Sequence, residues 1–229
     1  MTDNENKKPI ELVVYDFDGT SITGNSPVIL VRYLWNHRLL RKTVLTRIGF
    51  WALRYKFRLP QNESYVRGLV FSAFEGMPKE EADAFLVKFY EEKIEQRFRS
   101  LAQDSINRHR ESGRVVWMVS ATFEPIAQEA CKRHNYSRQF STRMLVDENG
   151  NYTRKVLGLP VEGEEKLRVI TKAADEEFGK GNWSLEYAYG DHHSDKFMLA
   201  ASKHPCAVSP DKPLKRYAKR FGWTILEWR

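Results

Sequence analysis

Short apolar runs separated by long amphipathic stretches set the pattern of this chain. Strand-like runs rich in β-branched and aromatic residues occur at 13–15, 115–119 and 185–189, with a shorter one around Ala207. Continuous apolar runs of this length, bounded by polar residues, are typical of strands buried on both faces of a sheet. We therefore predict a central sheet whose strands lie far apart in the sequence.

Helical periodicity fills most of the chain between these runs. Apolar positions recur every three, four or seven residues, as expected for helices with one buried face. The predicted helices cover 27–57, 63–74, 78–110, 125–134, 163–178 and 211–220. Residues 140–146 and 152–156, joined by a turn that contains Asn149-Gly150, predict a β-hairpin.

Strands alternate with helices everywhere except in the hairpin and in the long helical stretch before the second strand. Alternation of this kind favours a parallel sheet covered by helices on both faces. We predict an α/β fold with a Rossmann-like parallel sheet core, formed by residues 1–25 and 111–229. Residues 26–110 are predicted to form an inserted all-helical cap.

Polar residues that could take part in catalysis or ligand binding follow the predicted strands. Asp16 and Asp18 end the first strand, Ser120 ends the second, and Asp191 and Asp195 follow the third. The carboxyl ends of parallel strands meet at one edge of a sheet, which is where ligands bind in such folds. Like charges held close together need a cation or a proton between them. Each feature also has a plain structural interpretation, since aspartate is a common turn residue and serine a common helix cap.

The net charge of +7 is concentrated in one part of the chain. The stretch from Gly19 to Asn62 contains no acidic residue and eight cations: Arg32, Arg38, Arg41, Lys42, Arg47, Arg54, Lys56 and Arg58. The rest of the chain is nearly neutral, so the basic character belongs to the predicted cap. Such a stretch suits a phosphorylated substrate, including a lipid phosphate, or contact with an anionic membrane surface.

The remaining composition narrows the expected location and partners. The two cysteines, Cys131 and Cys206, are far apart and fit a reducing cytosol better than a disulfide framework. No apolar run is long enough to span a bilayer, and no nucleic-acid-binding motif is recognised. We expect a cytoplasmic protein, peripheral at a membrane if the basic cap makes that contact, and no nucleic-acid partner.

Four motifs in a fixed order give the sequence a family resemblance. Asp16-Phe17-Asp18-Gly19-Thr20, Ser120, Lys166, and Gly190-Asp191 with Asp195 strongly resemble the four motifs of the haloacid dehalogenase superfamily. The first and fourth motifs are specific, whereas a single serine or lysine is not. The helical insertion resembles the cap of the subfamily that includes phosphoserine phosphatase.

This resemblance implies a Mg²⁺-dependent phosphatase. Asp16 is the implied nucleophile, which forms an aspartyl-phosphate, and Asp18 the implied general acid and base. Ser120 and Lys166 are implied to bind the substrate phosphate. The implied Mg²⁺ ligands are the Asp16 carboxylate, the Asp18 backbone carbonyl and Asp191, and oxygen ligands are those that Mg²⁺ prefers. Asp195 is implied to orient Lys166 or a metal-bound water.

Several alternatives remain open at this point. Lys155 competes with Lys166 as the third motif, but it falls in the predicted hairpin, whereas Lys166 opens a helix. His192 and His193 invite a transition-metal site, although adjacent loop side chains often diverge. A phosphotransferase would use the same residues as a hydrolase, and a basic membrane-binding module would need none of the four motifs.

The basic stretch also bears on the substrate. Phosphoserine carries an ammonium group that needs an acidic or carbonyl partner, and the stretch from Gly19 to Asn62 offers no carboxylate. An anionic substrate with an apolar body fits this stretch better. The expected substrate is therefore a small phosphorylated molecule, with a lipid phosphate as the preferred case.

Overall fold

The computed structural model describes residues 8–39, 46 and 70–228. Its core is a 6-stranded sheet in the order β3-β2-β1-β6-β7-β8, and every neighbouring pair is parallel. The strands are β1 (Ile10–Tyr15), β2 (Val115–Phe123), β3 (Arg138–Thr142), β6 (Trp183–Gly190), β7 (His204–Val208) and β8 (Thr224–Leu226). The predicted α/β fold with a parallel sheet is confirmed.

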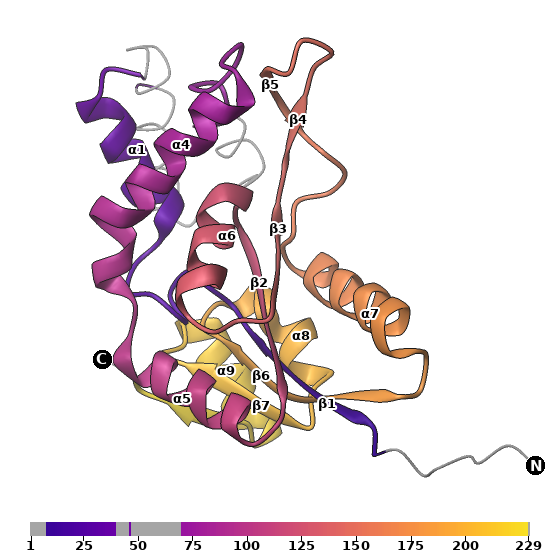
Figure 1. Ribbon diagram of the computed structural model, residues 1–229. Coiled ribbons are helices and arrows are strands. Elements are labelled where there is room, and N and C mark those ends of the chain that lie inside the picture. Colours follow the sequence, from indigo (N-terminus) through magenta and orange to yellow (C-terminus); the bar gives the residue numbers. More distant parts are fainter. Residues whose placement is uncertain (1–7, 40–45, 47–69, 229) are drawn as a thin grey trace, which may run out of the picture.

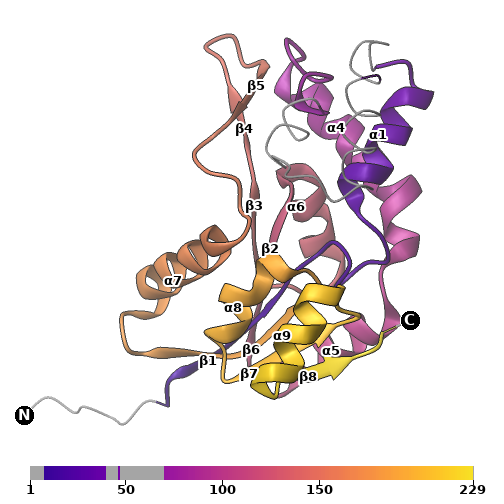
Figure 2. The same cartoon turned by 180° about the vertical axis from the view of Figure 1, so that it is seen from behind.

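Helices cover both faces of this sheet (Figures 1 and 2). On one face lie α5 (Ser100–Glu111) and α6 (Glu124–Arg133), and on the other lie α7 (Glu164–Phe178), α8 (Lys196–Ala200) and α9 (Lys212–Phe221). Successive residues of a strand point to opposite faces, so Val13 packs in one apolar cluster and Val14 in the other. Burial on both faces explains why β1 and β2 are apolar without alternation.

The prediction of one long helix over 78–110 is wrong. This segment is divided into α4 (Lys79–Phe89), a π-helix (Tyr90–Ile94), a 3₁₀ turn (Glu95–Arg97) and α5. Phe98 and Arg99, which lie between the 3₁₀ turn and α5, are extended. The Phe98 ring stacks on His134, with centroids 3.5 Å apart, and a tertiary contact of this kind overrides a local helical pattern.

Two connections join α1 (Ser26–Asn36) and α4 to the sheet, and they pair with each other. The Arg99 backbone amide donates to the Ser21 carbonyl at 2.9 Å, and the Thr23 amide donates to the Arg97 carbonyl at 2.8 Å. Ile22 and Phe98 lie opposite each other between these bonds in an antiparallel bridge. This paired segment ties the loop that follows Asp18 to the start of α5.

The hairpin prediction is correct only in part. β4 (Met144–Val146) pairs antiparallel with β5 (Tyr152–Val156), but the first half of the predicted strand over 140–146 belongs to β3 in the main sheet. The hairpin lies beside α4 in Figure 1, and the Tyr152 hydroxyl donates to Asp83 on α4 at 2.6 Å. A pair of strands this short gains stability by packing on a helix.

The division into core and cap stays a prediction. Helix α1 (Ser26–Asn36) and α4 lie together above the sheet (Figure 1), whereas α5, predicted as part of the cap, buries Ala102 and Ile106 in the apolar cluster on the sheet. The predicted helices over 27–57 and 63–74 fall largely outside the described residues, as do all the cations of the basic stretch except Arg32 and Arg38. No described helix is both long and apolar enough to cross a membrane.

A buried histidine on α5 makes stability depend on pH. His109 is 8% exposed and packs edge-on against the stacked rings of Tyr15 and Tyr189, with its Nε2 atom 2.9 Å from the Tyr189 hydroxyl. Burial, assisted by nearby arginines, lowers the pKa of His109 to about 4. The unfolded chain therefore binds a proton that the folded protein excludes between about pH 4 and pH 6.5, so this group destabilises the fold as the pH falls through that window.

We expect His109→Gln to make the free energy of unfolding less sensitive to acid. The difference from the wild type should be about 1 kcal/mol per pH unit between pH 6 and pH 4.5, measured by urea unfolding at several pH values. His204→Gln, on the exposed first residue of β7, is the matched control. Equal pH slopes in the wild type and His109→Gln would contradict this role of His109.

Candidate active site

The predicted acidic residues meet at the carboxyl edge of the central strands. Tyr15, the last residue of β1, is in register with Tyr189 of β6, so the residues that follow both strands emerge side by side. The backbone amide of Asp16 donates to the Tyr189 carbonyl at 2.9 Å, which extends this pairing by one residue. Parallel pairing thus brings Asp16 next to Asp191, although 174 residues separate them in the sequence.

Lys166 bridges two of the carboxylates. Its Nζ atom donates to Asp16 Oδ1 at 2.6 Å and to Asp195 Oδ1 at 2.6 Å, and all three side chains are buried. Lys166 lies in the first turn of α7, which follows Gly163 at a φ of 57°. The side chain of Asp195 also accepts from the His192 amide at 3.2 Å, which fixes the loop after β6.

Asp18 is held by the start of helix α1. Its two carboxylate oxygens accept from the backbone amide of Ser26 and, at 3.0 Å, from the Ser26 hydroxyl. The Ser26 hydroxyl also lies 2.7 Å from the Thr122 hydroxyl at the end of β2. Ser26 is buried and opens α1, so it links the position of this helix to that of Asp18.

Thr20 and Gly19 complete the loop after β1. The Thr20 hydroxyl lies 3.2 Å from Asp191 Oδ1 and 3.4 Å from Asp16 Oδ2. Gly19 has a φ of 76°, and a Cβ atom there would lie 2.1 Å from Asp191 Oδ2. Only glycine both adopts this conformation readily and leaves room for Asp191.

Burial and mutual repulsion raise the pKa values of these carboxyl groups. Desolvation is the main cause in each case, and it raises the pKa of Asp16 to about 6, of Asp18 to about 7 and of Asp191 to about 9. The charges of Asp16 and Asp195 raise the pKa of Asp191 further. Beside these carboxylates, the pKa of Lys166 is raised, so this lysine stays charged despite its burial.

The carboxylate cluster fits a hard divalent cation. Asp16, Asp191 and Asp195 each offer an oxygen, and these oxygens lie within 4.8 Å of one another. Among the described residues, Lys166 is the one cation hydrogen-bonded to the cluster, so the buried negative charge exceeds the positive. Carboxylate oxygens with excess negative charge suit Mg²⁺. The predicted role of Asp18 as a ligand through its backbone carbonyl stays a prediction.

The neighbouring histidines make protein contacts in this structure. His192 Nδ1 accepts from the Ser194 amide at 3.3 Å, and His192 Nε2 lies 3.5 Å from Asp211 Oδ2. His193 Nε2 lies 3.5 Å from Lys196 Nζ. Neither histidine belongs to the described group of residues that could hold a metal ion, so these contacts favour the loop interpretation.

The structure bears differently on the two predicted phosphate contacts, Ser120 and the motif lysine. Ser120 is buried at the end of the apolar part of β2, and its hydroxyl accepts from the Thr122 amide at 3.1 Å. Its role toward phosphate stays a prediction. Lys155 is exposed on β5 of the hairpin, whereas Lys166 contacts Asp16 directly. The geometry therefore favours Lys166 as the motif lysine.

Three residues near the site received no role in the sequence prediction. Thr20 stands next to the Asp-x-Asp-Gly motif, and a role for it was available from that position alone. Ser26 follows Asn25 and precedes Pro27, which marks a helix start, but nothing in that pattern indicates contact with Asp18. Thr122 approaches Ser26 only through the packing of β2 beside the loop after β1.

Comparisons with known proteins find relatives of this chain and solved structures with its fold. The family model described as haloacid dehalogenase-like hydrolase matches residues 13–200. A histidinol-phosphatase from Neisseria meningitidis serogroup C is 24% identical over 224 residues, covering 95% of this chain and 99% of that protein. A crystal structure of a protein of unknown function from Bordetella pertussis superposes with a TM-score of 0.85 at 19% identity, covering 96% of this chain and 99% of that one. A substrate-bound phosphoserine phosphatase superposes with a TM-score of 0.67 at 20% identity, covering 97% and 95%.

Proposed function

Because the chain belongs to the haloacid dehalogenase-like hydrolases, we propose that it is a Mg²⁺-dependent phosphatase that hydrolyses a phosphomonoester through an aspartyl-phosphate on Asp16. The observation that carries this proposal is the bridge from Lys166 to both Asp16 and Asp195, beside Asp191. It supports the proposal because the proposed nucleophile, a cation and carboxylates that could hold a metal ion share one buried cluster. The predicted family and hydrolase class are confirmed; the individual residue roles below are proposals.

The first chemical step joins Asp16 to the substrate phosphorus. A carboxylate oxygen of Asp16 attacks phosphorus, and the bond from phosphorus to the ester oxygen breaks. Asp18 gives its proton to the departing oxygen, which leaves as an alcohol. The hydrogen bonds from Ser26 hold the Asp18 carboxyl group in place for this transfer.

The second step releases phosphate. Asp18, now a carboxylate, takes a proton from a water molecule whose oxygen attacks phosphorus, and the bond to Asp16 breaks. Lys166 stabilises the Asp16 carboxylate both before attack and as it leaves, and it offsets charge on the phosphoryl oxygens. Dividing one displacement into two through a covalent intermediate lowers the barrier of each.

Asp16, Asp191 and the backbone carbonyl of Asp18 would hold Mg²⁺, with Asp195 near enough to orient its surroundings. When bound, this ion neutralises phosphate charge and lowers the repulsion between phosphate and the carboxylates. Thr20 donates toward both Asp16 and Asp191, which keeps their carboxylates oriented toward one point.

The substrate is proposed to be a small phosphorylated molecule. The names of the relatives include histidinol-phosphatase and phosphoserine phosphatase, whose substrates both carry a phosphate on a small organic body. A lipid phosphate remains our preferred specific substrate, because the stretch from Gly19 to Asn62 pairs cations with large apolar residues and has no carboxylate.

A substrate screen with and without metal tests the proposed function. Purified protein should hydrolyse an aryl phosphate in the presence of Mg²⁺, stop on addition of EDTA and recover with excess Mg²⁺. Among phosphoserine, histidinol phosphate, a sugar phosphate and a lysophospholipid phosphate, we expect the highest kcat/KM for the last. Activity that persists in EDTA would contradict the role of Mg²⁺, and a preference for phosphoserine would contradict the substrate assignment.

We expect Ser26→Ala to lower kcat by about 10-fold while changing KM little, because it removes a hydrogen bond of roughly 1–2 kcal/mol from the carboxyl group of Asp18. The backbone amide of Ser26 still donates to Asp18, so the loss should be partial. Ser100→Ala, at the exposed start of α5, is the matched control. A Ser26→Ala variant with wild-type kcat would show that the hydroxyl does not position Asp18.

A further inference from the structure

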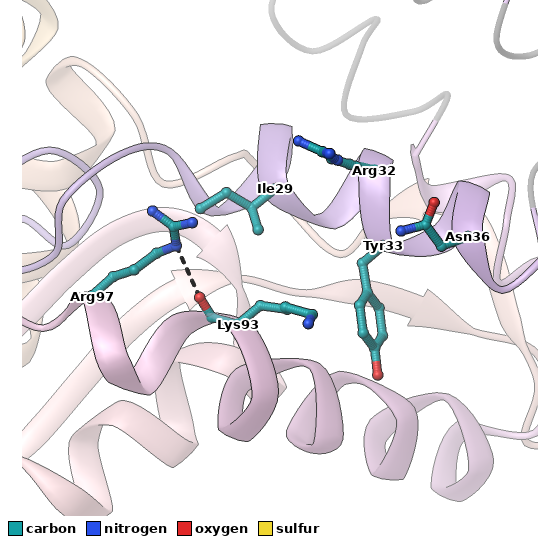
Figure 3. A pocket seen from close by; sticks show the side chains of 6 residues that line it. All are labelled: Ile29, Arg32, Tyr33, Asn36, Lys93 and Arg97. Carbon is teal, nitrogen blue, oxygen red and sulfur yellow. Dashed lines mark hydrogen bonds between the residues drawn. The ribbon is translucent and has the colours of Figure 1, made fainter.

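A cationic pocket lies between α1 and the segment that follows α4, and none of the carboxylate cluster lines it. It has a volume of about 270 Å³ and is lined by Ile29, Arg32, Tyr33, Asn36, Lys93 and Arg97. One wall is α1, and the other is the π-helix and 3₁₀ turn that follow α4 (Figure 3). Its lining includes three cations and no carboxylate.

No ion-pair partner of these cations lies among the residues that the structure describes. Arg32, Lys93 and Arg97 are exposed, and none forms an ion pair with another described residue. The Arg97 side chain is oriented by a backbone hydrogen bond, since its Nε atom donates to the Lys93 carbonyl at 3.0 Å (Figure 3). Other basic side chains, such as Arg133 and Arg154, do pair with glutamates. Cations gathered around one pocket repel one another, and an anion between them relieves that repulsion.

The acidic residue beside Lys93 in the sequence already has other partners. Glu92, next to Lys93, accepts a hydrogen bond from the Tyr33 hydroxyl at 3.1 Å and lies 3.8 Å from Lys88. It therefore holds Tyr33 in place and does not line the pocket. Tyr33 is buried and Ile29 half-buried, so the pocket combines an apolar base with a cationic rim.

We propose that this pocket binds a small organic phosphate or phosphonate anion at a second site, separate from the catalytic carboxylates. Arginine offers planar, paired donors that match the oxygens of phosphate groups. The volume is just below the range of roughly 300–1,000 Å³ that holds drug-sized ligands, so a small anion fits better. The apolar base suits a ligand with an organic body.

The pocket adjoins the paired connections between cap and sheet. The backbone carbonyl of Arg97 accepts from the Thr23 amide, and Thr23 lies between Asp18 and the start of α1. A ligand held by Arg32 and Arg97 would therefore join α1, which follows the outgoing connection, to the returning connection. Binding of an anion in this pocket does not depend on the proposed phosphatase activity.

The test is a titration of ¹⁵N-labelled full-length protein with phenylphosphonate and, separately, with inorganic phosphate. EDTA is present, so that the carboxylate cluster without metal repels anions. The side-chain amide of Asn36 reports on the pocket in every variant. The pocket variant is Arg32→Gln/Lys93→Gln/Arg97→Gln. The charge-matched control is Arg216→Gln/Lys219→Gln/Arg220→Gln on α9.

We expect both anions to shift the Asn36 signal, with phenylphosphonate binding more tightly. In the pocket variant the Kd should rise by at least about 10-fold, equivalent to about 1.4 kcal/mol, while the control stays close to the wild type. An unshifted Asn36 signal, or equal losses in the two triple variants, would overturn the proposal. Binding to phosphatidylglycerol vesicles without any response to phenylphosphonate would also overturn it, and would assign the cations to a membrane surface.

Discussion

Asp16→Asn should abolish turnover of every phosphate ester, with a loss of at least about 10⁴-fold in kcat, as expected when a covalent nucleophile is removed. The amide oxygen of asparagine is too weak a nucleophile to attack phosphorus. The substitution also removes a metal-binding carboxylate and one partner of Lys166. Single-turnover assays with an aryl phosphate at saturating Mg²⁺ measure this loss directly.

The fold should survive this substitution. Asparagine has nearly the shape of aspartate, and removing one buried carboxylate reduces the repulsion that raises the pKa of Asp191. Asp104→Asn, at an exposed position on α5, is the matched control and should keep full activity. Full activity in Asp16→Asn, or an equal loss in Asp104→Asn, would contradict the assignment of the nucleophile.

Lys166→Met should impair both the fold and the reaction. Lys166 is 4% exposed and bonds to two buried carboxylates, so its removal leaves both without their cation. Breaking a buried ion pair on one side destabilises a protein by about 3–5 kcal/mol. We expect the free energy of unfolding of the metal-free protein to fall by about this amount, as measured by urea unfolding.

Mg²⁺ should restore part of that stability, because a cation bound by Asp16 and Asp191 supplies charge that Lys166 no longer provides. Turnover should stay at least about 10²-fold below the wild type, since the phosphoryl oxygens lose a charged donor. Lys172→Met is the control on the same helix, where the lysine is exposed and lies 3.9 Å from Glu176. A Lys166→Met variant as stable and active as this control would refute the role of the bridge.

The sequence predicted the fold class and the place of the carboxylates because both depend on the order of the strands. Apolar runs buried on both faces indicated a parallel sheet, and the carboxyl ends of such strands meet at one edge. Asp16 and Asp191 follow neighbouring strands β1 and β6, so their approach needs only the correct strand order. The position of Lys166 at a helix start likewise needed no detailed packing.

Other features depend on packing between distant segments. The break in the helix predicted over 78–110 coincides with the stacking of Phe98 on His134, and no local pattern indicates that contact. The contact of Ser26 with Asp18 and Thr122 depends on how α1 leaves the loop after β1. The predicted strand over 140–146 is divided between two sheets, because β3 pairs with β2 up to Thr142 and β4 then pairs with β5.

The central claim, a phosphoryl group carried by Asp16, is tested most directly by trapping the intermediate. Protein reacting with an aryl phosphate and Mg²⁺ is quenched in acid, reduced with borohydride and digested, and the peptide around Asp16 is examined by mass spectrometry. Borohydride converts an aspartyl-phosphate to homoserine, so we predict homoserine at position 16 in the wild type and its absence in Asp16→Asn. Homoserine at another aspartate, or continued turnover with no modified aspartate, would contradict the account.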